Sequence, residues 1–279
     1  HAAKSRDIPV SSGFHSPFQD FSRFFDLAFL VKPIQHYLRW FHNNTQLTCV
    51  PSKDTEKALK QFGIKCPLVV VGRGVDTQQF SPLYRSEAYR CIWGADSNTT
   101  VMLYVGRLSP EKEIDVLIRN YICMLQRGEK HYKLVITGDG PDRQRLENLG
   151  KAHGVIFTGS LTGKNLASVY ASADVFVFAS QVETFGNVVL EAMASGLPVV
   201  AYNYACAHAH IEHGNTGWLS TLGDVNSFSS QMQCLPRPNI LNSMGQSARL
   251  KVMEMGWNHP VNQLEQALYH VAKETRMIA

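Results

Sequence analysis

Two glutamates separated by seven residues lie in the segment VETFGNVVLEAMASG, residues 182–196. Glu183 precedes a run with helical spacing, and Glu191 falls inside that run. A carboxylate accepts hydrogen bonds from two neighbouring hydroxyl groups, so such a pair suits a sugar ligand. We expect Glu183 to bind sugar hydroxyls from a loop and Glu191 to bind a ribose diol. The alternative, weighed equally on spacing alone, is that Glu183 caps the helix and Glu191 faces solvent.

The loop between these glutamates opens the same predicted helix. We expect the amides of Phe185, Gly186 and Asn187 at the helix N-terminus, where unpaired N–H groups and the helix dipole attract a phosphate or a polar sugar edge. Gly186 allows a ligand to approach the backbone closely. Thr184, in the same loop, is counted with these ligand-contacting residues.

A second segment with suitable chemistry is VGRLSPEK, which follows the apolar run TVMLYV. Gly106 and Arg107 stand at the end of the predicted strand, and Lys112 comes five residues after the arginine. Two cations that converge at the carboxyl end of a strand suit a diphosphate. The alternative is an ordinary charged surface loop. Gly138, in ITGDGP, marks another strand-end turn, but the chain shows neither a Rossmann GxGxxG nor a Walker motif.

Histidines form the third group of candidates. His15, in SGFHSPF, ends the first predicted strand and faces a ligand cleft if the sheet is parallel. His208, His210 and His213 lie close together in AHAHIEHG. No carboxylate or cysteine stands at the usual spacing from these three, so we expect no metal site.

The elements that must position these residues alternate regularly. Continuous apolar strands follow helices from about residue 98 to 202, which predicts an α/β fold with parallel sheets covered on both faces. We expect a partial N-terminal Rossmann-like domain over 1–85, a C-terminal one over 98–250, and a final helix over 255–279. Segment 83–99 loses this regular alternation, and we place the domain boundary there. Because only two or three strands precede residue 83, the N-terminal domain is expected to be truncated.

Composition and net charge favour some classes of protein and exclude others. The chain has 279 residues, of which 44% are hydrophobic and 18% charged, with a net charge of +4. This suits a globular protein with an anionic ligand or membrane surface as partner, and not a dedicated nucleic-acid binder. Six cysteines without CxxC spacing predict free thiols in a reducing cytosol. No apolar run reaches 18 residues, and the first residues lack the apolar core of a signal peptide.

An aromatic and basic segment, residues 18–42, allows two interpretations. It suits contact with an anionic bilayer surface, or it is a core helix of the N-terminal domain. We therefore expect a cytoplasmic protein and leave a peripheral contact with the inner face of the membrane open.

The whole string resembles family 4 of the retaining glycosyltransferases, which have the GT-B fold. The matching pieces stand in the family's order: GFHS, CVPSKDTEKALKQFGI, VGRGVDTQQFSP, YVGRLSPEK, VITGDGP, IFTGSLTGKNLASVYASADVFVFAS and ETFGNVVLEAMASGLPVVA. The E-x7-E and GRLSPEK segments are the specific ones. With this resemblance, we disfavour both alternatives given above: a helix-capping Glu183 with a solvent-facing Glu191, and an ordinary charged loop around Arg107 and Lys112.

This resemblance implies a role for each candidate. Arg107 and Lys112 correspond to the pair that holds the donor diphosphate, Glu183 to the sugar ligand, and Glu191 to the ribose ligand. His15 corresponds to the cleft histidine near the transferred sugar. The region of the nucleobase pocket corresponds to Phe157, Gly159 and Lys164.

The same resemblance implies the reaction. It favours transfer of a hexose, with mannose from GDP-mannose first, to a lipid or glycan hydroxyl, with retention and without a metal or other cofactor. A UDP-sugar-dependent glucosyl- or sulfoquinovosyl-type transferase is the nearest alternative. Two alternatives of other classes stay open, a sugar-nucleotide epimerase and a non-catalytic nucleotide-sugar-binding fragment.

Overall fold

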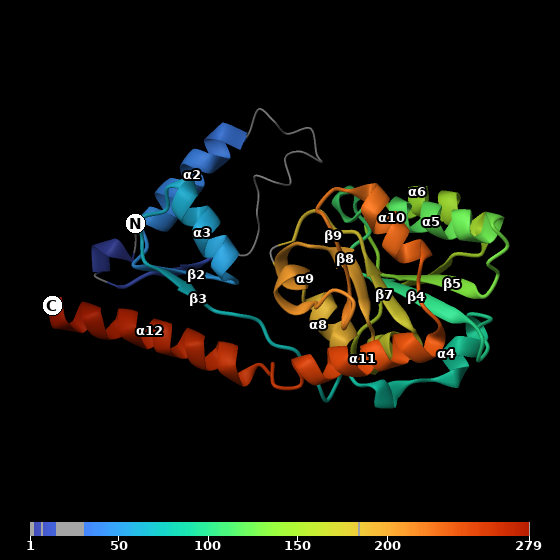
Figure 1. Ribbon diagram of the computed structural model, residues 1–279. Coiled ribbons are helices and arrows are strands. Elements are labelled where there is room, and N and C mark those ends of the chain that lie inside the picture. Colours follow the sequence, from blue (N-terminus) through green and yellow to red (C-terminus); the bar gives the residue numbers. More distant parts are fainter. Residues whose placement is uncertain (1–2, 7, 15–30, 184, 279) are drawn as a thin grey trace. The chain divides into compact units, whose positions relative to one another are not determined.

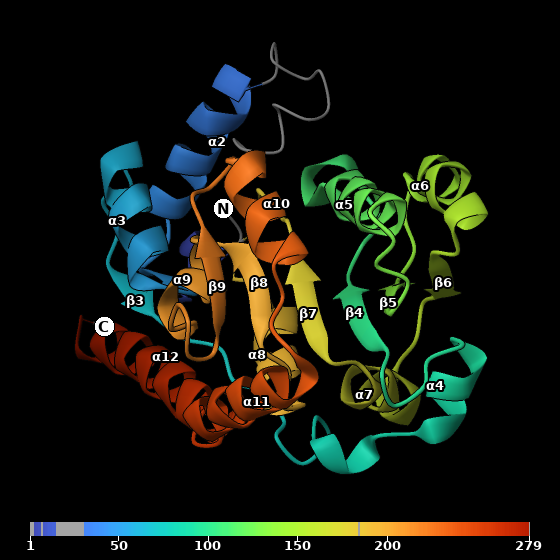
Figure 2. The ribbon, with the colours of Figure 1, turned by 45° about the vertical axis from the view of Figure 1, so that its right-hand side comes forward.

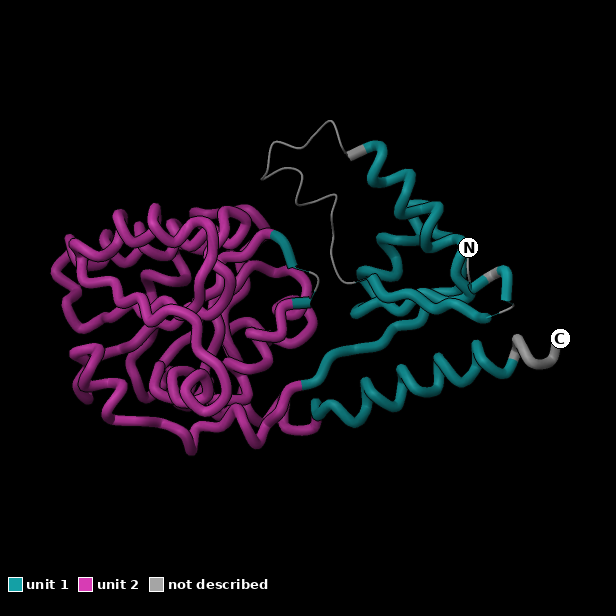
Figure 3. The backbone as a smooth tube through the Cα atoms, turned by 180° about the vertical axis from the view of Figure 1, so that it is seen from behind, with its two compact units in different colours: residues 1–74, 182–185, 255–279 teal, residues 75–181, 186–254 magenta. Residues whose placement is uncertain are grey.

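The computed structural model describes residues 3–6, 8–14, 31–183 and 185–278 (Figure 1). The chain divides into two compact units (Figure 3). Unit 1 comprises residues 1–74, 182–185 and 255–279, and unit 2 comprises residues 75–181 and 186–254. The two units are described separately.

Unit 1 is built on a small parallel sheet. Its strands are β1 (Ser11–Gly13), β2 (Leu47–Val50) and β3 (Leu68–Val70), in that spatial order. The sheet is accompanied by a short 3-10 helix, η1 (Lys4–Arg6), and by three α-helices, α2 (Val31–Asn43), α3 (Lys53–Phe62) and α12 (Asn258–Ile278). Side chains of a strand alternate between its two faces, and the two apolar clusters of unit 1 follow this rule. Val50 packs with Leu59 of α3, whereas Cys49 packs with Val271 of α12.

The start and end of α3 follow from two capping residues. The Ser52 hydroxyl accepts a hydrogen bond from the amide of Thr55 at 3.1 Å, which satisfies one of the free N–H groups of the first turn. Gly63 ends the helix in the left-handed conformation, and its amide donates to the carbonyls of Leu59 and Lys60.

Unit 2 contains a six-stranded parallel sheet, as the alternation of strands and helices predicts. The strands are β4 (Thr100–Val105), β5 (Tyr132–Thr137), β6 (Ile156–Gly159), β7 (Val175–Phe178), β8 (Val199–Tyr202) and β9 (Gly217–Ser220). Their spatial order is β6-β5-β4-β7-β8-β9, so the direction of winding reverses between β4 and β7. Strands buried on both faces read as continuous apolar runs, and every residue of β4 is buried.

Helices cover both faces of this sheet (Figure 2). Helices α5 (Ile114–Gln126), α6 (Arg143–Gly150) and α10 (Val225–Gln233) pack together on one face. Helices α8 (Asn187–Ala194) and α11 (Pro238–Val252) pack together on the other. The remaining helices of the unit are η3 (Pro82–Tyr84), α4 (Glu87–Ile92), η4 (Pro110–Lys112), η5 (Lys151–His153), α7 (Gly163–Ser172) and α9 (Ala205–His210).

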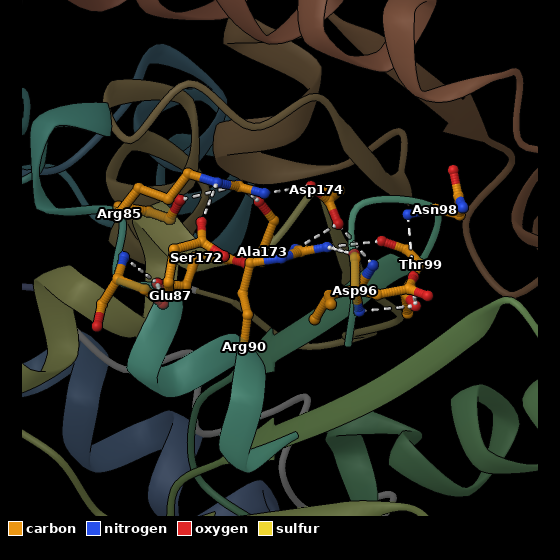
Figure 4. Close-up of polar contacts among 12 residues, drawn as sticks. Arg85, Glu87, Arg90, Asp96, Asn98, Thr99, Ser172, Ala173 and Asp174 are labelled. Atoms are coloured by element: carbon orange, nitrogen blue, oxygen red, sulfur yellow. Dashed lines mark hydrogen bonds and ion pairs between the residues drawn. The ribbon is translucent and has the colours of Figure 1, made fainter. Parts of the chain in front are cut away.

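Segment 83–99, where the sequence loses its alternation of strands and helices, contains α4, which is anchored by a buried arginine (Figure 4). The Arg90 guanidinium donates to Asp174 Oδ2 at 2.9 Å and to the carbonyls of Ser172, Asp96 and Thr99 at 2.8–3.0 Å. Asp174 precedes β7 and also accepts from the amide of Val101. The amino ends of the strands β4 and β7 are therefore held by a polar cluster whose members form hydrogen bonds with one another.

Candidate functional site

The topology of unit 2 places the candidate site at the carboxyl ends of β4 and β7. Ligands of open α/β sheets bind outside the carboxyl ends of the strands where the winding reverses. Arg107 is the second residue after β4, and Ser180 is the second residue after β7. The segment that contains Arg107 and Lys112 and the segment that leads to Glu183 therefore follow neighbouring strands at the same end of the sheet.

Arg107 presents an exposed guanidinium at this edge. Among the residues that the structure describes, no carboxylate pairs with this side chain. The main chain of Arg107 is held in place by a hydrogen bond, because the buried Tyr104 hydroxyl donates to the Arg107 carbonyl at 3.0 Å. An unpaired cation on a fixed backbone is suited to an anionic ligand.

Lys112 is half-buried at the end of η4 and is tied to the turn that follows β7. Its Nζ donates to Ser180 Oγ at 3.2 Å, and the amide of Gln181 donates to the Glu111 carbonyl at 3.0 Å. The two turns are thus joined side by side. Ser180 and Gln181 were not among the predicted site residues, because nothing in their local sequence shows which turn they meet.

Glu113 is a second residue that the sequence did not single out. It has left-handed backbone, with φ of 46°, at the start of α5, where glycine is the usual residue. Its carboxylate accepts hydrogen bonds from Gln181 Nε2 and from the Tyr202 hydroxyl, the latter at 3.0 Å. Burial raises the pKa of the Glu113 carboxyl, and the two hydrogen bonds oppose that rise. One carboxylate therefore links the start of α5 to the ends of β7 and β8.

Helix α8 opens next to this edge as predicted. Gly186 is its N-cap in left-handed conformation, with φ of 89°, and Asn187 is its first residue. No acidic residue stands in the first turn, so the positive end of α8 is not neutralised by its own side chains. Phe185 and Glu183 are half-buried in the preceding loop. Thr184 lies outside the described residues.

Glu191, one turn into α8, is mostly buried beneath this edge. The hydroxyl of Tyr170, on α7, donates to Glu191 Oε2 at 3.0 Å. Burial raises the pKa of the Glu191 carboxyl, and the Tyr170 hydrogen bond lowers it. The other oxygen, Oε1, has no hydrogen-bond partner within the described part of the chain. The ordinary alternative, a fully solvated helix residue, therefore does not hold for Glu191.

The predicted nucleobase residues follow the next strands of the same sheet. The amide of Gly138, after β5, donates to the carbonyl of Gly159, at the end of β6. A Cβ atom at Gly138 would lie 1.9 Å from the carbonyl oxygen of Gly106, so close packing of the turns requires glycine there. Phe157 is half-buried in β6, and Lys164 is exposed in the first turn of α7.

The structure describes three of the four candidate histidines. His15 lies outside the described residues. His208 Nδ1 bonds to Asn203 Oδ1 at 2.7 Å, whereas His213 Nδ1 accepts from the amide of Leu219 at 3.1 Å. Across residues 3–6, 8–14, 31–183 and 185–278, no group of three histidine, cysteine, aspartate or glutamate side chains is arranged to hold a metal ion. All six cysteines are free thiols.

Unit 1 contains a separate cavity of about 390 Å³ between its sheet and the start of α12. The lining is mainly apolar, with Val50, Val71, Trp257, Leu264 and Leu268 among its side chains. Ser12 and Arg73 provide polar groups at the same cavity. No helix in the described part of the chain is both long enough and apolar enough to cross a bilayer.

Comparison with known proteins identifies the family of the chain. Residues 99–236 match the family of glycosyl transferases group 1, and residues 1–79 match glycosyltransferase family 4. A sulfoquinovosyl transferase of Arabidopsis thaliana is 31% identical over 277 residues, 97% of this chain and 53% of the relative. A GDP-mannose-dependent alpha-mannosyltransferase of Mycobacterium tuberculosis is 36% identical over 225 residues, 80% of this chain and 57% of the relative.

Solved structures agree on the fold. A sucrose-phosphate synthase from Thermosynechococcus elongatus superposes with a TM-score of 0.81 at 21% identity, over 98% of this chain and 71% of that one. The Anabaena protein HepE, in complex with UDP and glucose, gives a TM-score of 0.77 at 21% identity, over 97% and 73%. The fold that these solved structures share with the chain is of the GT-B type. The chain belongs to glycosyltransferase family 4, and it spans a little over half the length of the curated relatives it matches.

Proposed function

We propose that the protein transfers a hexose from a nucleotide-sugar donor to an acceptor hydroxyl with retention of configuration. The observation that carries this proposal is the arrangement at the carboxyl edge of unit 2. The exposed Arg107 and the tethered Lys112 follow β4, and the open N-terminus of α8 comes after β7. Cations and helix amides at a strand edge suit the diphosphate of such a donor.

The proposed chemistry needs a stabilised leaving group. The bond between the anomeric carbon and the diphosphate oxygen breaks, and the acceptor oxygen bonds to that carbon from the same face. The acceptor proton passes to a diphosphate oxygen. Arg107 and Lys112 offset the charge that develops on the departing diphosphate. The family resemblance assigns three further roles: Glu183 would orient the sugar, Glu191 would hold the ribose, and His15 would act near the transferred sugar.

The first test of the reaction is substitution of Arg107. We expect Arg107→Ala to lower the release of nucleoside diphosphate from the nucleotide sugar by about a hundredfold or more. The matched control is Arg119→Ala, because the Arg119 side chain is 67% exposed on α5 and pairs with Asp115 of the same helix. Near-normal turnover in the Arg107 variant would refute the proposed role of the cation.

The proposed donor is GDP-mannose, supported by the GDP-mannose-dependent relative at 36% identity. A UDP-sugar is the alternative. Isothermal titration with GDP, UDP and ADP, each with and without magnesium, separates the two. Binding selective for GDP and independent of magnesium supports the proposal, whereas binding selective for UDP replaces it with a UDP-sugar donor. Consumption of the nucleotide sugar without any acceptor would indicate an epimerase, and binding without turnover a non-catalytic binding protein.

The proposed acceptor carries an apolar portion, so we favour a lipid over a glycan. The support is the mainly apolar lining of the unit 1 cavity, which suits acyl chains beside a polar head. Leu264→Asp, in the cavity wall, should raise the KM for a diacylglycerol-type acceptor and leave the Kd of the nucleotide unchanged. Equal losses for lipid and soluble sugar acceptors would count against a lipid.

We further propose that α2 contacts an anionic bilayer surface. Tyr37, Trp40 and Phe41 stand at spacings of three and four and are 57%, 49% and 38% exposed. Exposed basic residues, Lys32 and Arg39, lie on the same helix. Trp40→Ser should reduce flotation with phosphatidylglycerol vesicles, whereas Leu83→Ser, at a residue 92% exposed in unit 2, should not. Equal flotation of both variants would argue against this contact.

A further inference from the structure

Tyr170 lies in the core of unit 2, yet its polar atom points at a residue of the candidate site. The side chain is fully buried on α7, and its hydroxyl donates to Glu191 Oε2 at 3.0 Å. Burial raises the pKa of the Tyr170 hydroxyl well above its usual value, so the group stays protonated and acts as a donor at neutral pH. The contact joins α7 and α8 through two residues that are 21 positions apart along the chain.

The ring of Tyr170 is held by neighbouring aromatic side chains. It meets Phe80 edge to face, with ring centroids 5.5 Å apart, and packs against Phe176 of β7 at 5.8 Å. Such packing restricts a buried ring to one rotamer. The hydroxyl therefore has a fixed position, and the carboxylate that accepts from it is fixed in turn.

The Glu191 carboxylate accepts fewer hydrogen bonds than expected of a partly buried carboxylate with a purely structural role. A carboxylate offers about four acceptor positions, and no arginine, lysine or histidine of the described chain bonds to this one. Partial burial with one neutral donor costs free energy that glutamine or an apolar residue would avoid. The free oxygen, Oε1, is therefore best explained by a ligand that brings hydrogen-bond donors, such as a pair of hydroxyls.

We propose that Tyr170 is a positioning residue, which holds Glu191 in the single orientation that accepts the hydroxyls of the donor ribose. This inference rests on the proposed function, and it adds a residue that touches no substrate. The hydroxyl of Tyr170 occupies Oε2 and so directs Oε1 to the ligand. Without it the carboxylate gains rotamers that do not face the ribose.

The test compares two nucleotides that differ only in the diol. The Kd of the better-bound nucleoside diphosphate, GDP or UDP, is measured by titration calorimetry beside that of its 2′,3′-dideoxy analogue. In Tyr170→Phe, which keeps the ring, we expect binding of the ribonucleotide to weaken about tenfold. Binding of the dideoxy analogue should stay unchanged, so the preference for the diol should disappear.

Tyr104→Phe is the matched control. It removes the same atom from another fully buried tyrosine of unit 2, but one whose hydroxyl donates to the Arg107 carbonyl. This variant should affect both nucleotides alike and keep the preference for the diol. Loss of that preference in the control as well would overturn the inference, since any hydroxyl deletion in this core would then have the same effect.

The remaining outcomes separate this inference from the proposed function. A wild-type preference for the diol that Tyr170→Phe leaves intact would overturn the role of Tyr170 and leave the proposed function standing. Equal wild-type binding of both nucleotides would overturn the ribose role of Glu191 and this inference, but not nucleotide binding. No binding of either would overturn the proposed function and this inference with it.

Discussion

The buried Arg90 offers a prediction whose size can be worked from the structure. Its side chain is 4% exposed and reaches from α4 into the cluster of Figure 4. Arg90→Met keeps most of the volume but removes the ion pair with Asp174 and leaves the carbonyls of Ser172, Asp96 and Thr99 without this donor. Breaking a buried pair by removing one partner costs about 3–5 kcal/mol.

Arg85 supplies a control with the same chemistry and the same partner. Its guanidinium lies 3.3 Å from the other oxygen of Asp174, but its side chain is 42% exposed. Solvent screens such a pair, so Arg85→Met should cost about 0–1 kcal/mol. The two variants therefore differ in burial and hardly in anything else.

The assay is differential scanning calorimetry of the whole chain. For a unit of this size, Arg90→Met should lower the midpoint of unfolding of unit 2 by roughly 6–20 °C and Arg85→Met by no more than a few degrees. Nucleotide binding well below the transition should stay unchanged in both variants. Equal midpoint losses would refute the reasoning from burial, and loss of nucleotide binding would refute a purely structural role for the amino edge.

Three further predictions concern individual residues. Glu113→Ala should destabilise unit 2 by about 1–3 kcal/mol in urea denaturation, because the donors of Gln181 and Tyr202 lose their acceptor. Glu113→Gly should cost about 1 kcal/mol less than the alanine variant, since only glycine adopts the left-handed backbone freely, and equal costs would contradict this. The raised pKa of Glu191 should make stability fall as pH rises from about 4.5, the ordinary pKa, through the folded-state pKa, and Glu191→Gln should flatten that fall. Gly140→Ala should destabilise by about 1–3 kcal/mol because a Cβ would lie 2.3 Å from the Leu108 carbonyl oxygen, whereas Gly256→Ala, with open space around it, should be neutral.

Local patterns in the sequence predicted the parts of the fold that depend on near neighbours. The helix α3 begins after Ser52 and ends at Gly63, and both limits depend on contacts within four residues, which local sequence contains. The parallel sheet of unit 2 followed from apolar strands that alternate with helices. The expected domain limits of 1–85 and 98–250 remain predictions.

The features that the sequence left undecided have a common physical cause. The contacts that anchor the helix in segment 83–99 are distant along the chain, because Arg90 finds its acceptors near residues 96–99 and 172–174. Glu113 could not be singled out, because only the folded backbone shows its left-handed conformation and its contacts with Gln181 and Tyr202. Spacing alone left Glu191 undecided between site and surface, and its burial against Tyr170 supplies the missing information.

The central claim is that the carboxyl edge of β4 and β7 binds the diphosphate of a nucleotide sugar. The most direct measurement is the ratio of the Kd of a nucleoside monophosphate to that of the diphosphate with the same base, by calorimetry, in wild type, Arg107→Ala and Arg119→Ala. We expect wild type and Arg119→Ala to prefer the diphosphate by about tenfold or more, and Arg107→Ala to lose most of that preference. An unchanged preference in Arg107→Ala would contradict the account.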